Sequence, residues 1–493
     1  MSENGIKKKH PRGMYTLFFT EMWERFSYYG MRALLVLFMV DQVKNGGMGL
    51  DDATANSIYG LYTCMVYLAC LPGGWIADRL LGAQRSVWYG GIIIAAGHFS
   101  LAIPSTPTFF LGLVLVILGT GMLKPNISAV VGQLYPEGGA RRDAGFTIFY
   151  MGINLGAFLG PLVCSSLGES ERFGWHWGFG AAGAGMVLGL IQYRFNSRFL
   201  GDAGREPGHR RDPALGTDPA WYGVLACLGV VVVTVGMALA GAFEINPVAL
   251  AKGTTYVIVG MAALYFGGVF IFAKLDSVEK KRVVVIIVLF IASAMFWSGF
   301  EQAGSSLNLF ADRYTDRIVM GWEVPAGWFQ SLPPAFIIAF APVFAAMWVS
   351  LARRNLNPTM PIKFALGLVL LAIGFAVMFF ASKLVADNNT VLPTWLFFTY
   401  LFHTMGEICL SPVGLSAVTK LAPKRFVGQM MGAWFMATAL GNLVAGILAS
   451  RFDPSALDEM PGLYFQIVMT SFGVGLLLLI FSKPVQKLTG GIK

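Results

Sequence analysis

The chain has 493 residues, of which 56% are hydrophobic and only 13% are charged, whereas typical soluble domains are about 25% charged. A mean hydropathy of +0.63 excludes a water-exposed globular surface and also excludes a disordered chain. Most of the protein therefore has lipid as its solvent. The net charge of +9 does not by itself indicate a nucleic-acid partner, because Lys and Arg set the topology of membrane proteins.

Apolar segments long enough to cross a bilayer recur along the whole chain. A span needs roughly 20 apolar residues, and it must be helical because lipid cannot satisfy open backbone groups. The apolar runs are continuous, whereas the strands of a β-barrel alternate. The sequence predicts fourteen spans, at about residues 14–40, 53–77, 86–104, 108–134, 144–167, 174–195, 219–243, 253–274, 283–310, 326–352, 362–382, 392–419, 426–449 and 461–481.

The basic residues orient these spans. Loops on the side of the N-terminus hold 26 Lys and Arg residues, and loops on the other side hold seven. Because an excess of Lys and Arg marks the cytoplasmic side, both termini are predicted to be cytoplasmic. The five cysteines fall within spans and form no CxxC pair, so neither disulfides nor a metal site is expected.

The order of the spans suggests the domain organisation. The spans near 219–243 and 253–274 are almost free of polar residues and follow the longest cytoplasmic loop, near 196–218. Without that pair, six spans remain on each side. The sequence therefore predicts an N-terminal six-helix bundle over 1–195, a loop and two-helix insert over 196–279, and a C-terminal six-helix bundle over 280–493. Two related halves around a central site are a common transporter plan.

Seven charged residues lie inside the predicted spans, away from the span ends. Each costs about 2.5–3.5 kcal/mol on insertion scales, so an intramembrane charge indicates function unless it forms a purely structural ion pair. Three cations and four anions nearly cancel, which suggests mutual pairing around an aqueous cavity. These residues are Glu21, Glu24, Arg25, Arg32, Lys124, Glu301 and Glu407.

The first span carries a charged stripe. Glu21, Glu24, Arg25, Tyr28 and Arg32 fall on one helical face about 100° wide, which cannot face lipid. Both carboxylates have Arg25 within helical reach. A carboxylate beside a guanidinium stays ionised, and one that loses this partner in a desolvated site can take up a proton. The stripe is therefore a candidate proton-coupled switch.

Further polar side chains on other spans join the candidate cavity. Aromatic residues alone are more often packing residues, but those on the same face as a charge favour a binding role. His98 is expected to pack, and His403 is a possible neighbour of Glu407. The additional candidates are Tyr150, Asn154, Trp297 and Ser411.

Motifs of nucleotide-driven pumps and hydrolases are missing from the sequence. It contains no GxxxxGKS/T, HExxH or GxSxG pattern, which argues against a primary pump and against an enzyme. An ion gradient would then supply the energy, and titratable carboxylates favour H⁺. A membrane-embedded hydrolase and a channel are the alternatives from other classes.

Five short motifs belong together. They are EMWERFSYYG at 21–30, GWIADRLLGAQR at 74–85, GMLKPN at 121–126, FYMGINLGAF at 149–158 and GEICLSPVGLS at 406–416. This set resembles the signatures of the proton-dependent oligopeptide transporter family, in the major facilitator superfamily, and the uncharged insert is similar to that of its bacterial 14-span members. The resemblance covers nearly the whole chain.

The resemblance implies symport of protons with di- and tripeptides by alternating access in the plasma membrane, the inner membrane of bacteria. It implies no enzymatic activity, no nucleic-acid partner, no cofactor beyond the proton as coupling ion, and function as a monomer. The alternative within transport is a proton-coupled carrier of another small solute, such as nitrate or a carboxylate.

The resemblance also implies roles for single residues. Proton coupling would involve Glu21, Glu24, Arg25, Lys124 and Glu301. Arg25, Arg32 and Lys124 would bind the peptide carboxylate, Glu407 the amino group and Asn154 the peptide backbone. Arg32 and Glu301 would form a gating pair. The pocket would be lined by Tyr28, Tyr29, Tyr67, Tyr150, Trp297, Ser411 and Trp434.

These roles suit a zwitterionic substrate, because fixed charges can clamp both ends of a peptide and aromatic pockets accept varied side chains. A guanidinium binds a carboxylate in a bidentate manner. One position departs from the family pattern. Pro333 stands where the family commonly has an Asn that contacts the peptide, and proline offers neither a side-chain donor nor a backbone N–H, so one contact is expected to differ.

Overall fold

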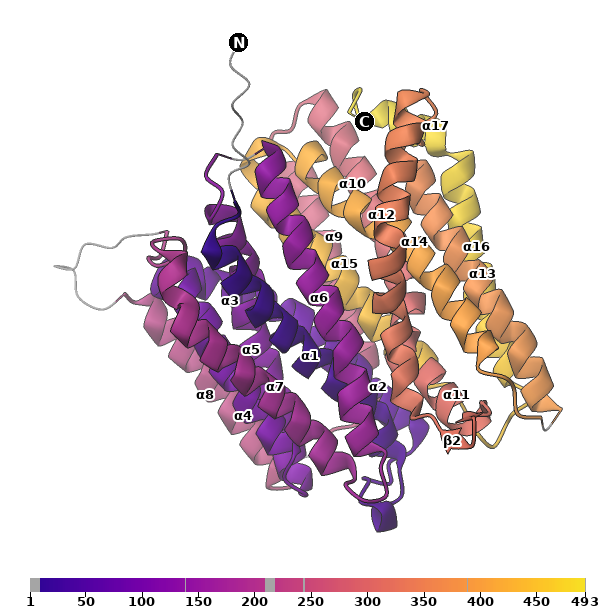
Figure 1. The fold of residues 1–493 in the computed structure, drawn as a ribbon. Helices are drawn as coiled ribbons and strands as arrows, with labels where there is room; N and C mark the ends of the chain where they lie inside the picture. The colour runs from indigo at the N-terminus through magenta and orange to yellow at the C-terminus, as the bar shows by residue number, and fades with distance from the viewer. Residues whose placement is uncertain (1–8, 138, 209–217, 243, 388, 493) are drawn as a thin grey trace. The chain divides into compact units, whose positions relative to one another are not determined.

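A computed structural model of the protein describes residues 9–137, 139–208, 218–242, 244–387 and 389–492. Residues 1–8 and 493, at the two predicted cytoplasmic termini, and residues 209–217 of the predicted cytoplasmic loop lie outside the described residues. The described chain is built from helices (Figure 1), with one short antiparallel hairpin of β1 (Ile318–Val319) and β2 (Trp322–Glu323).

The predicted spans coincide with helical segments, although the span at 53–77 is divided between two helices and the span at 283–310 is broken after residue 300. The helices are α1 (Arg12–Val40), α2 (Asp52–Leu68), α3 (Cys70–Ile76), α4 (Ala83–Leu101), α5 (Thr106–Gln133), α6 (Gly139–Gly168), α7 (Trp175–Asn196), α8 (Ala220–Leu239), α9 (Pro247–Phe272), α10 (Ser277–Phe300), α11 (Ser306–Tyr314), α12 (Leu332–Arg353), α13 (Met360–Ala386), α14 (Thr394–Leu421), α15 (Val427–Ala449), α16 (Met460–Ile480) and α17 (Ser482–Leu488). Short helical turns join them at η1 (Val43–Asn45), η2 (Ala77–Leu81), η3 (Ser197–Leu200), η5 (Glu301–Gly304), η6 (Ala326–Ser331) and η7 (Lys424–Phe426).

Among the described residues, eleven helical segments are long and apolar enough to cross a membrane. The predicted spans at 14–40, 86–104 and 174–195 lie on helices but fall outside those eleven; the span at 14–40 carries four charged residues, Glu21, Glu24, Arg25 and Arg32. The all-α membrane fold is confirmed. The exact number of fourteen spans and the side of the termini stay predictions.

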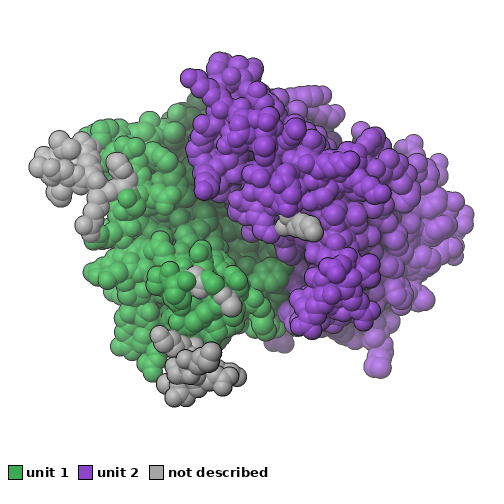
Figure 2. All heavy atoms as spheres, turned by 90° about the horizontal axis from the view of Figure 1, so that it is seen from above, with its two compact units in different colours: residues 1–31, 69–168, 176–245 green, residues 32–68, 169–175, 246–493 purple. Residues whose placement is uncertain are grey.

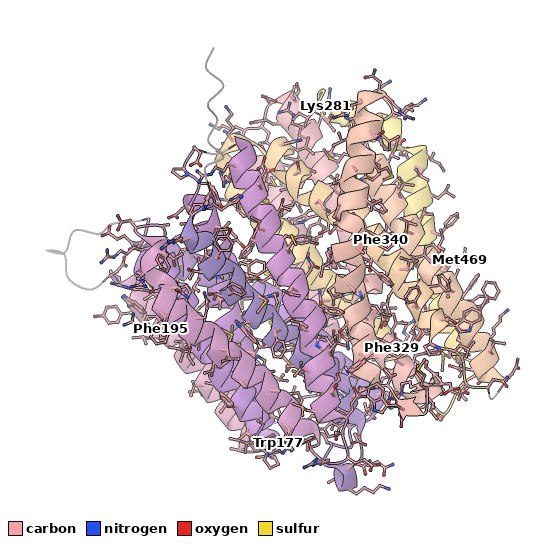
Figure 3. The ribbon with its side chains drawn as sticks, in the orientation of Figure 1. Trp177, Phe195, Lys281, Phe329, Phe340 and Met469 are labelled. Atoms are coloured by element: carbon pink, nitrogen blue, oxygen red, sulfur yellow. The ribbon has the colours of Figure 1, made fainter. Side chains whose placement is uncertain are left out.

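Apolar side chains project from the outer faces of the helices, as lipid-facing surfaces require. Trp177, Phe195 and Met469, labelled in Figure 3, are 64%, 75% and 54% exposed. Such exposure of large apolar residues would be a liability in water but is the normal state of a helix in a bilayer.

Close packing divides the chain into two units (Figure 2). Unit 1 comprises residues 1–31, 69–168 and 176–245, and unit 2 comprises residues 32–68, 169–175 and 246–493. The two units are defined by which residues pack together, whereas the predicted bundles over 1–195 and 280–493 are defined by the order of the helices along the chain. The predicted division into bundles and insert stays a prediction.

In unit 1, glycines let the backbone of α1 lie directly against α6 and let α7 pack on an α1 side chain. A Cβ atom added to Gly156 of α6 would lie 2.1 Å from the carbonyl oxygen of Met22, and one at Gly160 would lie 2.4 Å from that of Phe26. Gly185 of α7 faces the Phe26 ring from another side. Small residues at such crossings allow close helix packing in membranes. The position of the charged stripe of α1 is therefore fixed by backbone contacts.

In unit 2, α11 and β2 lie at one end and α17 at the other (Figure 1). At the first of these ends, Arg313 makes two hydrogen bonds to Asp52, at 2.6 and 2.9 Å. Arg317 pairs with Asp312 at 3.2 Å and with Glu323 at 2.9 Å. These contacts fix the hairpin and α11 to the start of α2.

Glu169 fixes the loop after α6 to η6 in the same unit. Its carboxylate accepts hydrogen bonds from the backbone N–H groups of Ala326, at 2.6 Å, and Gly327, at 2.9 Å. Burial raises the pKa of Glu169 to about 7, although the two N–H donors and nearby Arg317 favour the charged form; Asp312 raises the pKa further. The contact is therefore sensitive to pH near neutrality.

We expect Glu169 to weaken folding as the pH rises from 4.5, its ordinary pKa, to about 7, because the folded state binds the proton more tightly than the unfolded state. The Glu169→Gln variant should flatten the pH dependence of the melting temperature of the detergent-solubilised protein over this range. Glu171→Gln, an exposed neighbour, is the matched control. Identical pH profiles for wild type and Glu169→Gln would contradict the expectation.

Candidate functional site

The predicted charged stripe forms a compact ion cluster on α1 in unit 1. The Nε atom of Arg25 contacts Oε2 of Glu24 and lies 3.2 Å from Oε1 of Glu21. The three side chains are at most 4% exposed. The Arg25 guanidinium also lies over the Tyr28 ring, 5.2 Å from its centroid. One guanidinium thus serves two buried carboxylates, as helical spacing indicated.

The ion cluster is incompletely satisfied. Within the described part of the chain, Oε2 of Glu21, Oε1 of Glu24 and Nη2 of Arg25 are buried without a hydrogen-bond partner. Buried polar atoms normally have partners, so each exception calls for an explanation. Two carboxylates that share one cation in an apolar site can be relieved by taking up one proton. The geometry therefore suits proton binding.

Lys124 of α5 adds a second cation to this group. It is half-buried and lies within electrostatic range of Glu21, Glu24 and Arg25. The set of two acids and two bases is neutral when no proton is bound. Uptake of one proton gives it a positive charge, which would attract an anionic ligand group.

The other candidates in unit 1 lie on α1 and α6. The rings of Tyr28 and Tyr29 meet edge to face, with centroids 5.2 Å apart. Tyr150 is 42% exposed, whereas Asn154 is 4% exposed and donates its Nδ2 hydrogen to the carbonyl oxygen of Tyr150 at 2.9 Å. The Asn154 amide also has a second N–H and an Oδ1 acceptor, so it can bind a ligand while keeping this bond within its own helix.

A second ion cluster lies in unit 2. Nη2 of Arg32 is 2.5 Å from Oε2 of Glu301, and Nε of Arg32 donates to the Tyr59 hydroxyl at 2.5 Å. The Arg32 and Glu301 side chains are 7% and 4% exposed. The predicted pair is therefore present as a buried ion pair, while its role as a gate stays a prediction. Tyr400 lies within electrostatic range of Arg32 and Tyr59.

The chain breaks its helix at this second cluster. α10 ends at Phe300, the turn η5 carries Glu301, and α11 starts at Ser306. Asn308 donates to the carbonyl oxygen of Ala33 at 2.8 Å, so the start of α11 is tied to the same α1 segment that carries Arg32. The break therefore fixes Glu301 against Arg32.

The remaining candidates in unit 2 lie on α2, α10, α14 and α15. Glu407 is half-buried and within electrostatic range of Glu301. His403 is 1% exposed and packs on Phe375, with ring centroids 4.6 Å apart, so it serves packing here. Trp434 is 6% exposed, and Tyr67, Trp297 and Ser411 are half-buried.

Pro333 occupies the first turn of α12, where a helical N–H has no partner within the helix. A proline is well tolerated at this position. The position of Pro333 at the start of α12 therefore explains why a proline is tolerated there.

The sequence-predicted residues fall into two sets. Glu21, Glu24, Arg25 and Lys124 come together with their tyrosines in unit 1, and Arg32, Glu301 and Glu407 come together in unit 2. Sequence reasoning missed Tyr59 and Tyr400. Both are buried on apolar helices, and no spacing signal connects them to Arg32.

Comparison with known proteins identifies the family. Residues 84–462 match the family described as PTR2, POT family. The chain belongs to the POT family. It is 44% identical to the peptide transporter YePEPT of Yersinia enterocolitica, over 97% of this chain and 95% of that protein. It is 36% identical to a di-/tripeptide transporter of Lactococcus lactis, over 98% and 97% of the two chains.

A solved structure supports this assignment. The crystal structure of peptide transporter POT in complex with sulfate is similar, with a TM-score of 0.89, 41% identity and coverage of 99% of this chain and 97% of that one. The family resemblance of the five sequence motifs is confirmed. POT family members are transporters and not enzymes, and they are multi-pass proteins of the inner membrane.

Gly304 is predicted to be essential for the second ion cluster. A Cβ atom at Gly304 would lie 1.9 Å from the Tyr59 hydroxyl and 3.0 Å from Nε of Arg32. Gly304→Ala should therefore destabilise the protein by about 1–3 kcal/mol, as overpacking does, and should slow transport. Thermal unfolding and uptake measurements would check this.

Two further variants sharpen the Gly304 test. Gly462→Ala is the matched control, because a Cβ atom there meets nothing within 4 Å. Removing the clashing hydroxyl with Tyr59→Phe should restore part of the stability of Gly304→Ala. Equal effects of the Gly304 and Gly462 substitutions would refute the expectation.

Proposed function

We propose that the protein imports di- and tripeptides together with protons by alternating access across the plasma membrane. The observation that carries this proposal is the buried pair Glu21 and Glu24 sharing one guanidinium, Arg25, in a chain of the POT family. The proton is the coupling ion. We further propose that a single chain is the functional unit, with the bundles and insert divided as the sequence predicts.

Proton binding and peptide binding are linked through charge. With no proton bound, Glu21, Glu24, Arg25 and Lys124 sum to zero. A proton on either carboxylate leaves a net positive charge that favours the peptide carboxylate, and the bound carboxylate in turn favours the proton. Such mutual stabilisation is the thermodynamic basis of symport, because linkage between two binding events is reciprocal.

Peptide recognition is proposed to use the two ends of the substrate. Arg25, Arg32 and Lys124 would bind the carboxylate, and Glu407 would bind the amino group. Asn154 would bond the peptide backbone through its Oδ1 or its second N–H, while its other N–H stays bonded to the carbonyl oxygen of Tyr150. The pocket for peptide side chains would be lined by Tyr28, Tyr29, Tyr67, Tyr150, Trp297, Ser411 and Trp434.

Arg32 and Glu301 are proposed as the gating pair, and Glu301 also as part of proton coupling. Their 2.5 Å contact is buried, and breaking such a pair leaves an uncompensated charge. A proton on Glu301, or the positive amino group of a peptide near Glu407, offers a replacement charge balance. Opening is therefore expected to follow binding.

A proton-coupled carrier of nitrate or a small carboxylate is the second candidate function. The basic residues Arg25, Arg32 and Lys124 would suit an anion. Glu407 argues against this candidate, because a half-buried acid beside Glu301 repels anions and suits an amino group.

Substituting either acid of the α1 cluster should separate coupling from binding. In proteoliposomes with an inward proton gradient, Glu21→Gln and Glu24→Gln should lose accumulation of labelled dialanine above equilibrium, because the neutral side chain cannot release a proton. Counterflow exchange of peptide should be partly kept. The exposed Asp458→Asn is the control.

If both variants lost exchange and accumulation to the same extent, the α1 cluster would have only a structural role and the prediction would be wrong. Wild-type uptake of several dipeptides no greater than in protein-free vesicles would refute the proposed function itself.

Glu407→Gln should distinguish the two candidate functions. Loss of one charge-assisted hydrogen bond, worth about 1.5–3 kcal/mol, should lower dipeptide uptake by about tenfold to a hundredfold. Nitrate uptake measured on the same vesicles should not fall. Unchanged peptide uptake in this variant would show that Glu407 does not bind the amino group.

A further inference from the structure

A cavity that we call the basic cavity lies in unit 2, at the helix ends where α9 leads into α10 and α14 leads into α15. Its volume is about 710 Å³, within the range of about 300–1,000 Å³ typical of ligand sites. Residues from 274–282 and 419–427 line it. The bases among them are Lys274, Arg282, Lys420, Lys424 and Arg425; the acids are Asp276 and Glu279.

Both acids of this basic cavity are engaged in local contacts. Asp276 accepts hydrogen bonds from the backbone N–H groups of Val278 and Glu279, each at 2.7 Å. Glu279 accepts the N–H of Asp276 at 3.2 Å and lies 3.4 Å from Nη2 of Arg425. This reciprocal capping box fixes the start of α10. With five bases and two acids, the lining of the cavity carries a net positive charge.

Arg425 joins the two loops of the basic cavity. Its Nη2 donates to the carbonyl oxygens of Ala273, at 2.7 Å, and Lys274, at 3.3 Å. Lys274 itself has a φ of 48° and directly follows Ala273, the C-cap of α9, where a left-handed residue commonly ends a helix. The bonds from Arg425 hold this helix end against the loop that precedes α15.

An apolar surface adjoins the basic cavity. On α9, Leu264, Ile271 and Phe272 are 78%, 73% and 80% exposed, and Phe272 is only two residues from Lys274. A ligand that combines an anionic head with apolar chains fits this pairing of surfaces. A free anion would occupy the basic cavity but would not contact the apolar surface.

We propose that the basic cavity binds the phosphate of an anionic phospholipid, whose acyl chains lie along α9. Basic pockets between transmembrane helices on the cytoplasmic side are suited to anionic headgroups, and the excess of Lys and Arg at this end predicts that it faces the cytoplasm. The bound lipid would link the insert helix α9 to α14. Because α14 carries Glu407, transport should respond to the lipid, and this last consequence alone rests on the proposed function.

Two lysines close to the basic cavity that do not line it provide a comparison. Lys280 and Lys281 lie on the same first turns of α10 and are exposed, yet they do not line the cavity; Figure 3 labels Lys281 at this end of unit 2. If positive charge alone attracts lipid, these lysines should matter as much as those that line the cavity.

The test measures lipid binding by the full-length protein without measuring transport. Short-chain phosphatidylglycerol is added to detergent-solubilised protein, and the rise in melting temperature is compared with that given by phosphatidylcholine. We expect phosphatidylglycerol to stabilise the wild type more. The triple variant Lys274→Gly, Lys420→Gln, Lys424→Gln should bind phosphatidylglycerol more weakly, by about fivefold per lysine removed, since each surface base contributes about 1 kcal/mol. Glycine at 274 keeps the left-handed backbone.

The control variant Lys280→Gln, Lys281→Gln, Lys487→Gln removes the same charge outside the cavity and should bind phosphatidylglycerol as the wild type does. Equal weakening in both triple variants would overturn the proposal, because general charge attraction would explain the binding. If Lys274→Gly, Lys420→Gln, Lys424→Gln proves unfolded, Lys274→Gly alone must still weaken binding.

Two further arms identify the source of the anion. Inorganic phosphate at matched ionic strength should stabilise the wild type much less than phosphatidylglycerol does, because it lacks acyl chains. Equal stabilisation would overturn a lipid in favour of a free anion. Displacement of phosphatidylglycerol by polyglutamate, but not by phosphate, would overturn it in favour of an acidic protein partner.

Discussion

A charge inside a membrane must have a counter-charge close by, and this constraint organises the structure around α1. That helix carries Glu21, Glu24, Arg25 and Arg32, more than half of the seven charged residues found within the predicted spans, away from the span ends. Arg25 balances the two acids beside it, and Arg32 is balanced by Glu301 from a segment nearly 270 residues away in the chain. The break between α10 and α11, the glycine at 304 and the hydroxyl of Tyr59 all serve this second pairing.

Local periodicity made the first cluster predictable. The spacing of Glu21, Glu24 and Arg25 on one helix determines that they share a face, so no tertiary information was needed. The positions of the predicted spans were equally accessible, because lipid leaves a strong compositional signal. The pairing of Arg32 with Glu301 came from family resemblance and not from spacing, and its functional role remains a prediction.

Other features depend on packing between segments that are far apart in the chain, and no sequence pattern predicts them. Tyr59 looks like any aromatic residue on an apolar helix until Arg32 is placed against it. Glu169 follows the end of an apolar segment, and nothing in the sequence shows that it accepts two backbone hydrogen bonds from η6. Arg313 and Arg317 are two of the seven Lys and Arg residues that the topology count places opposite the N-terminus, and their ion pairs fix the hairpin end of unit 2. A charge count cannot distinguish a solvated loop residue from one with a defined partner.

The glycine contacts of α1 have a mechanical consequence. Where Gly156 and Gly160 meet the backbone of α1, no layer of side chains lies between the helices to absorb a displacement. Sliding one helix past the other would force main-chain atoms into each other, so this interface resists shear far more than an interface of leucines. We infer that α6 and the unit 1 portion of α1 move together as one rigid element. The motion required by a transport cycle would then occur at interfaces where larger side chains separate the helices.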